Sequence, residues 1–259
     1  MGEQRRYEFC VILCKRATPC QITMRFVAYT LAVVALWATP LGANPTFSDA
    51  KRELRYLYLF LDSSFQKDFY CQIPFSTRLY RGKPQLRPLP QALSDFGIKK
   101  QSSTIEWEHI MPAHTFGKHL VCWVQGGRKK CQKNPLFQKM ESDTQNIVPT
   151  IGQINRDRRN YAYADAPKSM RFTQYGKCEV YVDTKTQRFY PAAYSKGYIA
   201  RSYLYMVKTY NIPLDSDTIA QMREWDRIYP MSEQEQYLRH QLGLINQKLI
   251  VQSLSKLLQ

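Results

Sequence analysis

The spacing of apolar side chains predicts a helix in residues 46–61, TFSDAKRELRYLYLFL. Apolar residues recur there at the three- to four-residue period of an amphipathic helix, and Thr46 or Ser48 can cap its first turn. The apolar positions that carry this pattern are Leu54, Leu57 and Leu61. We therefore expect this segment to lie against a core along one face.

A second helical segment is predicted at residues 146–160, NIVPTIGQINRDRRN. Asn146 is placed to cap it and Pro149 falls in its first turn, where a missing N–H is tolerated. Ile151 and Ile154 would face the core. The apolar stretch at 198–211 predicts another helix, and residues 232–258 predict a long final one.

The remaining segments read as strand or loop. Residues 103–110, STIEWEHI, predict a strand from their β-branched and aromatic content. Residues 73–100 contain four prolines up to position 90 and predict loop or edge strand, and residues 115–140 predict mostly loop. Helices and strands mix without a regular βαβ rhythm, so we expect an α+β fold.

The N-terminal region has the pattern of an export signal. After Met24 and Arg25 comes FVAYTLAVVALWATPLGA, an apolar run that ends in small residues. We expect a signal peptide cleaved near Ala43, with translation starting at Met1 or Met24. The alternative is an uncleaved membrane anchor. Residues 1–43 then form the extension and signal, and residues 44–259 form a single domain.

The charge of the chain indicates a polyanionic partner. It carries 37 Lys and Arg against 21 Asp and Glu, and removal of residues 1–43 still leaves a formal charge of +13. The alternatives are nucleic acid, an anionic membrane surface, or charge that serves only solubility. The 18 tyrosines and 12 phenylalanines suit base stacking and favour nucleic acid.

Four cysteines remain after the predicted cleavage: Cys71, Cys122, Cys131 and Cys178. Export permits disulfides, and four cysteines allow three pairings. Cys122 and Cys131 bracket the glycine-containing stretch WVQGGRKK, so we expect them to pair, with Cys71–Cys178 as the second bridge. A zinc site is the alternative, but the chain has no Cys-x-x-Cys spacing.

Candidate chemistry gathers in residues 104–119, TIEWEHIMPAHTFGKH, which hold three of the four histidines. Glu108 and His109 are adjacent, and an extended backbone points neighbours to opposite faces. They can serve one site if the strand ends there, as Pro112 suggests. A carboxylate can then hold Mg²⁺ while a neutral imidazole takes a proton from water.

A zinc hydrolase is a weaker interpretation of the same stretch. His114 and His119 are five residues apart and do not stack on one helix face as i, i+4 ligands do. The chain also has no H-E-x-x-H motif.

Five motifs occur in order between residues 47 and 232: EWEHIMPA, CWVQGGRKKC, KMESD, NIVPTIGQINRDRRN and RSYLYMVKTYN followed by EWDRIYP. Together they resemble the bacterial endonuclease I family, periplasmic or secreted DNases with a ββα-metal (His-Me finger) active site. The chain departs from the family in its cysteines, in its C-terminal segment, and at Arg156, which stands where the family has glycine.

The resemblance implies a role for four residues. His109 becomes the general base, Glu108 and Asn155 become the protein ligands of one metal ion, and Arg128 contacts the scissile phosphate. An asparagine inside a helix is a mediocre helix former, so a ligand role gives Asn155 a reason to be there. Glycine at position 152, one turn earlier, would leave room for an ion and a phosphate, and ordinary close packing explains it equally well.

The sequence therefore predicts an exported, sequence-non-specific endonuclease with one Mg²⁺, for which Mn²⁺ or Ca²⁺ can substitute in binding. DNA is the expected partner, and RNA is cut by the same route if it fits. We expect 5′-phosphate and 3′-hydroxyl ends, a periplasmic or extracellular monomer, and no stable membrane association after cleavage. The alternative is a secreted, non-catalytic nucleic-acid-binding protein.

Overall fold

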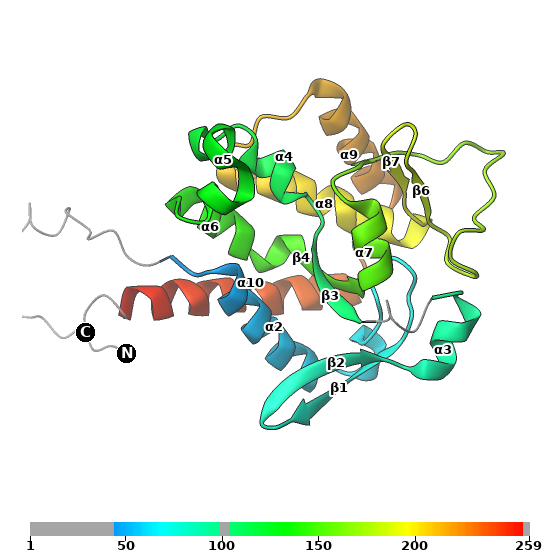
Figure 1. The fold of residues 1–259 in the computed structure, drawn as a ribbon, viewed down its shortest axis with the longest axis horizontal. Helices are drawn as coiled ribbons and strands as arrows, with labels where there is room; N and C mark the ends of the chain where they lie inside the picture. The colour runs from blue at the N-terminus through cyan, green and yellow to red at the C-terminus, as the bar shows by residue number, and fades with distance from the viewer. Residues whose placement is uncertain (1–43, 99–103, 256–259) are drawn as a thin grey trace, which may run out of the picture. The chain divides into compact units, whose positions relative to one another are not determined.

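The computed structural model describes residues 44–98 and 104–255 (Figure 1). Helices and short strands mix in it, so the fold is α+β as predicted. None of the helices in these two ranges is long and apolar enough to cross a membrane. The expected signal segment, residues 1–43, lies outside the described residues.

Figure 1 labels the elements in chain order. The α-helices are α2 (Phe47–Phe60), α3 (Pro90–Asp95), α4 (Ala113–Gly117), α5 (Val121–Cys131), α6 (Pro135–Ser142), α7 (Gly152–Arg158), α8 (Ala193–Tyr210), α9 (Ser216–Ile228) and α10 (Glu233–Ser255). The strands are β1 (Phe75–Tyr80), β2 (Lys83–Pro88), β3 (Ile105–His109), β4 (Ile147–Ile151), β5 (Ala162–Tyr163), β6 (Tyr181–Asp183) and β7 (Arg188–Tyr190). The described part of the chain also contains two 3₁₀ turns, η1 (Ser63–Phe65) and η3 (Thr144–Asn146).

Helix α2 begins where the sequence predicted. Thr46 is its cap: the Thr46 hydroxyl accepts from the backbone N–H of Asp49, and the Asp49 carboxylate accepts from the backbone N–H of Thr46. This reciprocal pair satisfies two N–H groups that have no partner inside the helix. Leu54 is fully buried and Leu61 nearly so, which anchors the helix along one face.

The prediction of one helix over 146–160 is wrong in its first half. Residues 147–151 form strand β4, antiparallel to β3, with Glu108 opposite Val148 and His109 opposite Ile147. All five β4 residues are buried, so a two-sided apolar strand took the place of the expected first helical turns. Helix α7 starts only at Gly152.

Asn146 is therefore not a helix cap. Its side-chain oxygen accepts from the Met111 N–H, and its side-chain nitrogen donates to the Met111 carbonyl. These two bonds tie the start of β4 to the chain just after β3. Ile151 and Ile154 are fully buried, as expected.

Residues 115–140, predicted as mostly loop, contain three short helices: α4, α5 and α6 (Figure 1). Asn134 caps α6 by accepting from the Phe137 N–H, and Pro135 occupies its first position. Phe116 and Phe137 are buried and pack against each other, with ring centroids 5.4 Å apart. Burial of these aromatic rings stabilises helices too short to form alone.

Residues 73–100 contain the hairpin β1–β2 followed by helix α3. The hairpin fits the edge-strand prediction, whereas α3 was not predicted. Arg81 and Gly82 form its two-residue turn, and both have positive φ, 49° and 74°. Such a turn matches the twist of the paired strands, and glycine adopts it without steric cost.

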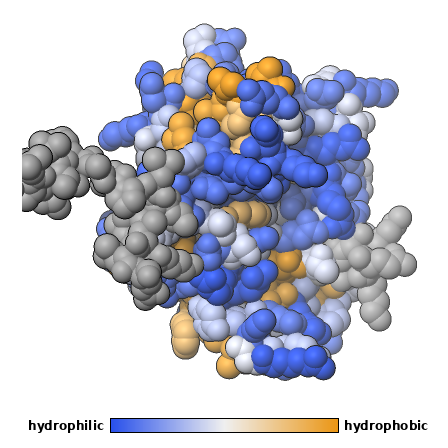
Figure 2. Space-filling view, turned by 60° about the vertical axis from the view of Figure 1, so that its left-hand side comes forward, coloured by the Kyte–Doolittle hydropathy of each residue, from blue (hydrophilic) through white to orange (hydrophobic). Residues whose placement is uncertain are grey.

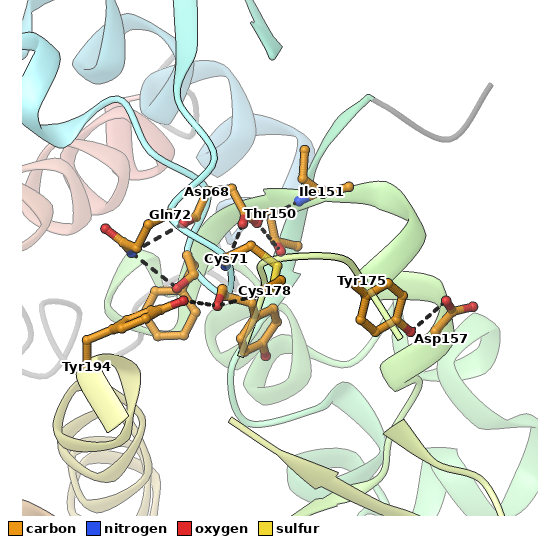
Figure 3. Close-up of a disulfide and its surroundings, with 11 residues drawn as sticks. Asp68, Cys71, Gln72, Thr150, Ile151, Asp157, Tyr175, Cys178 and Tyr194 are labelled. Carbon is orange, nitrogen blue, oxygen red and sulfur yellow. Dashed lines mark hydrogen bonds between the residues drawn. A yellow bond between two sulfur atoms is a disulfide. The ribbon is translucent and has the colours of Figure 1, made fainter. Parts of the chain in front are cut away.

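Both predicted disulfides are present, Cys122–Cys131 and Cys71–Cys178. Asp68 lies beside the Cys71–Cys178 disulfide and hydrogen-bonds to the backbone of Cys71 (Figure 3). Its buried carboxylate accepts from the Cys71 N–H, the Thr150 hydroxyl and the Ile151 N–H. Asp68 thereby joins the bridge to strand β4, which pairs with β3.

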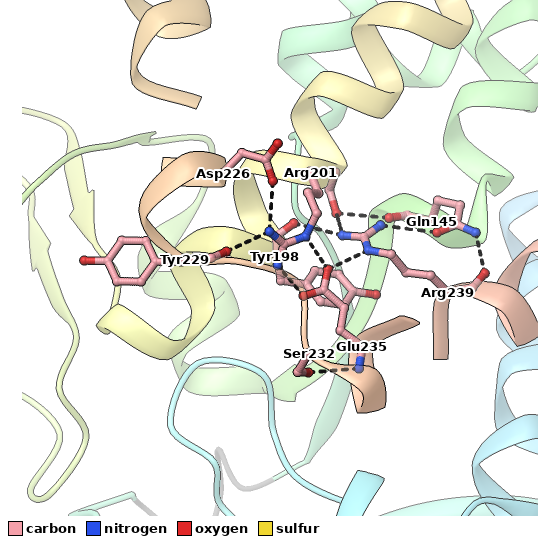
Figure 4. Close-up of polar contacts among 9 residues, drawn as sticks. Gln145, Tyr198, Arg201, Asp226, Tyr229, Ser232, Glu235 and Arg239 are labelled. Atoms are coloured by element: carbon pink, nitrogen blue, oxygen red, sulfur yellow. Dashed lines mark hydrogen bonds and ion pairs between the residues drawn. The ribbon is translucent and has the colours of Figure 1, made fainter. Parts of the chain in front are cut away.

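The predicted helix at 198–211 is confirmed as α8, and the one at 232–258 is confirmed as α10 up to Ser255, beyond which it lies outside the described residues. Polar contacts hold the two helices together (Figure 4). Arg201 of α8 donates to Asp226 of α9 and to Glu235 of α10. Arg239 of α10 also donates to Glu235, and its guanidinium lies 4.0 Å from the Tyr198 ring centroid. Each arginine side chain is mostly buried and paired, which favours a defined arrangement of the three helices.

Candidate active site

The four predicted site residues line one cavity of about 300 Å³. Glu108 and His109 come from the end of β3, Arg128 from α5 and Asn155 from α7. Strand β3 ends at His109, as predicted. The side chains of Glu108 and His109 leave opposite faces of the strand and still line the same cavity. The cavity is lined by Glu108, His109, Pro112, Ala113, His114, Trp123, Arg128, Asn155, Arg156, Arg158, Arg159 and Asn160.

His109 is buried and has one ring nitrogen engaged. Its Nε2 lies 2.8 Å from the backbone carbonyl oxygen of Glu141. A carbonyl oxygen can only accept, so Nε2 carries the proton and Nδ1 of the neutral ring is left as an acceptor. The Phe47 ring lies 4.5 Å from the imidazole, between centroids. Burial lowers the pKa of His109 to about 4, so the ring is neutral at neutral pH.

Glu108 is also buried, and it faces a different set of partners. Its Oε1 accepts from the guanidinium of Arg158 and from the Tyr70 hydroxyl, the latter at 3.2 Å. Burial raises the pKa of Glu108, while the charge and hydrogen bonds of Arg158 and the Tyr70 hydroxyl act in the opposite direction. The carboxylate is therefore held in one orientation by two buried donors.

Arg158 is the largest buried charged side chain among residues 44–98 and 104–255, and the sequence analysis did not identify it. It is fully buried, donates to the carbonyl oxygens of His109 and Ile110 at 3.1 and 2.8 Å, and stacks on Tyr163 at 4.5 Å. One guanidinium thus fixes both the Glu108 carboxylate and the backbone that leaves β3. An arginine so placed cannot be lost without leaving a buried carboxylate unpaired.

Asn155 lies in the middle of α7. Its Nδ2 donates to Oε2 of Glu106 at 3.0 Å, so the acceptor end of the amide, Oδ1, is the end not turned toward Glu106. A carboxylate from Glu108 and an amide oxygen from Asn155 are hard oxygen donors of the kind that Mg²⁺ prefers. Both line the cavity, so these residues fit a small divalent cation.

Gly152 lies directly under the ends of the Glu106 and Arg156 side chains. A Cβ atom there would lie 2.4 Å from Oε1 of Glu106 and 2.8 Å from a guanidinium nitrogen of Arg156. Of the two interpretations left open by the sequence, the structure supports packing of Glu106 and Arg156 over the first turn of α7.

Arg128 lies on a broken helix, where a loop was expected. The backbone of α5 leaves helical geometry at Gly126 and Gly127, and Gly127 has a φ of 60°, a region that favours glycine. Arg128 follows this break with a side chain 45% exposed. Its Nε donates to Oε1 of Glu141 at 2.7 Å, which leaves the rest of the guanidinium at the cavity.

The other histidines of the 104–119 stretch form no metal centre. His114 lines the cavity and its ring lies edge-on to Trp123 at 5.8 Å, whereas His119 is exposed and does not line the cavity. Within residues 44–98 and 104–255, no three histidine, cysteine, aspartate or glutamate side chains come together as a metal site.

Arginine is the most frequent residue type among those that line the cavity. Four of its lining residues are arginines and Glu108 is its one carboxylate. The face of the molecule in Figure 2 is mostly hydrophilic, with smaller hydrophobic areas. Arg158 is fully buried and paired with Glu108, whereas Arg128, Arg156 and Arg159 are exposed. Exposed guanidinium groups beside a neutral imidazole suit a phosphodiester, because they can bind its oxygens.

A family model described as Endonuclease I matches residues 68–242. The chain belongs to the endonuclease I family. The match begins at the buried Asp68 and covers every residue of the cavity.

The chain is also similar in sequence to several named bacterial nucleases. A periplasmic deoxyribonuclease of Aeromonas hydrophila is 38% identical over 221 residues, which cover 83% of this chain and 88% of that protein. An extracellular deoxyribonuclease of the same species is 38% identical over 210 residues, 79% and 86% of the two chains. Endonuclease-1 of Buchnera aphidicola subsp. Acyrthosiphon pisum (strain APS) is 37% identical over 167 residues, 64% of this chain and 65% of that protein.

Sequence reasoning missed five residues that contact the predicted site: Phe47, Tyr70, Glu106, Glu141 and Arg158. Only Glu106 could have been found from the sequence, by its spacing from Glu108. Glu106 and Glu108 are two apart on a strand, so they share one face of β3, the face that meets α7. The others come from distant parts of the chain, and local pattern does not connect them with Glu108 or His109.

Proposed function

We propose that this member of the endonuclease I family is an exported, sequence-non-specific endonuclease that hydrolyses DNA, and RNA by the same route if it fits. The observation that carries the proposal is the neutral, buried His109 ring. Its Nδ1 is left as an acceptor, and the ring lines the same cavity as the oxygen donors Glu108 and Asn155 and four arginines.

In this mechanism Nδ1 of His109 takes a proton from water, which attacks phosphorus. Hydrogen bonding of Nε2 to the Glu141 carbonyl holds the ring in the tautomer that this step needs. The Arg128 guanidinium binds a non-bridging phosphate oxygen. Water is the nucleophile, so a 2′-hydroxyl is not required and DNA is a substrate.

Glu108 and Asn155 would hold one divalent ion, Mg²⁺, with Mn²⁺ or Ca²⁺ able to replace it in binding. When bound, such an ion stabilises negative charge on the phosphate and on the departing 3′ oxygen. Arg158 and Tyr70 keep the Glu108 carboxylate oriented for this task. The expected products carry 5′-phosphate and 3′-hydroxyl ends.

We place the protein in the periplasm or outside the cell as a monomer without stable membrane association. The names of the Aeromonas relatives, periplasmic and extracellular deoxyribonuclease, support export. The two disulfides support it as well, because such bonds persist in oxidising compartments. Phosphate contacts carry no base information, so sequence specificity is expected to be slight.

Incubation of purified protein with supercoiled plasmid, with and without EDTA, tests the proposal. We expect nicking and linearisation with Mg²⁺, complete inhibition by EDTA, and recovery when Mg²⁺ is added back in excess. Binding of DNA with no cleavage under any of these conditions would favour the alternative, a secreted nucleic-acid-binding protein without catalysis.

A further inference from the structure

Glu106 contacts the proposed metal ligand Asn155 but has no role in the mechanism above. Its Oε2 accepts from Nδ2 of Asn155 at 3.0 Å, and its Oε1 pairs with the guanidinium of Arg156. Its side chain is 33% exposed, so it lies at the edge of the site. Each carboxylate oxygen therefore has a separate donor from α7.

The backbone places Glu106 for this contact. It shares one face of β3 with Glu108, and its partner across the β3–β4 pair is Thr150, two residues before α7 begins. Gly152 lets the carboxylate lie over the first turn of the helix, since a Cβ there would come within 2.4 Å of Oε1. The contact is built from three neighbouring elements.

A side-chain amide has two ends of similar size and opposite character. Its nitrogen donates hydrogen bonds and repels cations, whereas its oxygen accepts hydrogen bonds and binds them. Rotation by 180° about the last side-chain bond exchanges the two ends. A metal ligand of this type therefore needs a partner that distinguishes them, and a carboxylate does so because it can only accept.

We propose that Glu106 is a positioning residue that holds the Asn155 amide with Oδ1 available to the metal ion. Rotation of the amide would turn Oδ1 toward Oε2 of Glu106, two acceptors in contact. Arg156 pairs with the other carboxylate oxygen, Oε1, and does not contact the amide in this arrangement. This inference rests on the proposed function, in which Asn155 is a ligand.

The test compares Mg²⁺ affinity, measured by calorimetry without DNA, in four proteins: unaltered, Glu106→Ala, Asn155→Asp, and the double variant. Loss of Glu106 should weaken Mg²⁺ binding by about 10- to 100-fold, the usual effect of losing a partner that orients a ligand. Aspartate has two equivalent oxygens and needs no orientation. In the Asn155→Asp background, the same Glu106→Ala change should therefore leave affinity unchanged or improve it, by relieving carboxylate repulsion.

The different effect of Glu106→Ala in the two backgrounds distinguishes a role in orienting the Asn155 amide from a contribution of negative charge alone. If Glu106 only contributed negative charge, its removal would weaken Mg²⁺ binding by the same factor in both backgrounds, and that result would overturn the inference. Equal affinity of the Glu106→Ala variant and the unaltered protein would overturn it too. Thermal melts of all four proteins identify any variant that fails to fold, and Glu106→Gln, which retains an acceptor oxygen, then replaces Glu106→Ala with a smaller expected loss.

Arg156→Ala is the matched control on the same helix. It removes the other partner of Glu106 and leaves the contact with Asn155, so Mg²⁺ affinity should be retained or increased. If Arg156→Ala weakened Mg²⁺ binding as much as Glu106→Ala does, the Arg156–Glu106 ion pair, and not the orientation of the Asn155 amide, would determine the affinity. Failure of the proposed function looks different: the unaltered protein would bind no Mg²⁺, or Glu108→Ala would not weaken binding.

Discussion

Nε2 of His109 donates to the backbone carbonyl oxygen of Glu141 at 2.8 Å. The partner is main chain, so the tautomer of the ring does not depend on the protonation of any side chain. The Glu141 side chain is free for another task and accepts from Arg128. One residue of α6 thus holds both the proposed base and the proposed phosphate-binding arginine.

His109→Ala should lower the turnover of plasmid DNA by about 10²- to 10⁴-fold, the range expected for loss of a general base. DNA binding should change little, because the arginines remain. Turnover and gel-shift affinity measure the two effects separately. His114→Ala, which changes another histidine of the same cavity, is the control. A reversed pattern, with His114 essential, would move the base to that residue.

Arg128→Ala should lower kcat by about 10²-fold, as for loss of one donor to a developing oxyanion. Lys129→Ala, an exposed neighbour on the same helix, should have little effect on kcat. Single-turnover cleavage at saturating DNA measures both. Circular dichroism should accompany the assay, since the variant leaves the buried Glu141 carboxylate without its partner. Similar losses in both variants would assign Arg128 to general charge attraction.

Cleavage should leave 5′-phosphate and 3′-hydroxyl ends, because water attacks phosphorus and the 3′ oxygen departs. Ligation of limit digests by DNA ligase, without prior end repair, is the measurement. A matched digest pretreated with phosphatase supplies the negative control. Fragments with 3′-phosphate ends, or undiminished activity in EDTA, would contradict the assignment of leaving group and metal.

Replacement of both Cys122 and Cys131 by serine should lower the free energy of unfolding by about 2–3 kcal/mol, typical for a short closed loop. Activity should fall as well, because the bridge joins the two ends of the helix that carries Arg128. Urea denaturation and plasmid nicking measure the two effects. The Cys71–Cys178 bridge remains in this variant and keeps the comparison local. Unchanged stability would show that packing, as of Trp123 against Phe137, holds α5 without the bridge.

Asp49→Asn should destabilise the protein at pH 7 and not in strong acid. Burial alone would raise the pKa of Asp49, but hydrogen bonds from the Thr46 side chain and backbone and from Arg52 lower it below 3.8 overall. A lowered folded-state pKa contributes stability above pH 3.8, and this contribution is lost as pH falls through the lower folded value. We expect a difference of about 0.5–1 kcal/mol at pH 7. Urea denaturation at several pH values measures it, and a difference independent of pH would contradict the role of the charge.

The local sequence pattern was sufficient to predict some of the helices and strands. The α2 cap, strand β3, and helices α8 and α10 follow from capping residues and apolar spacing, which act within a few residues along the chain. The same holds for the Cys122–Cys131 pair, whose nine-residue separation limits the possible geometry. The local pattern also pointed to Glu108 and His109, whereas Arg128 and Asn155 were assigned only through the resemblance to the endonuclease I family.

Tertiary structure decided the rest. Residues 147–151 are a strand because β3 offers a partner and the core covers both faces, although their composition also fits a helix. Glu106, Glu141 and Arg158 become part of the site only when β3, α6 and α7 meet. Burial and hydrogen bonding depend on which distant groups exclude water, and spacing along one chain does not contain that information.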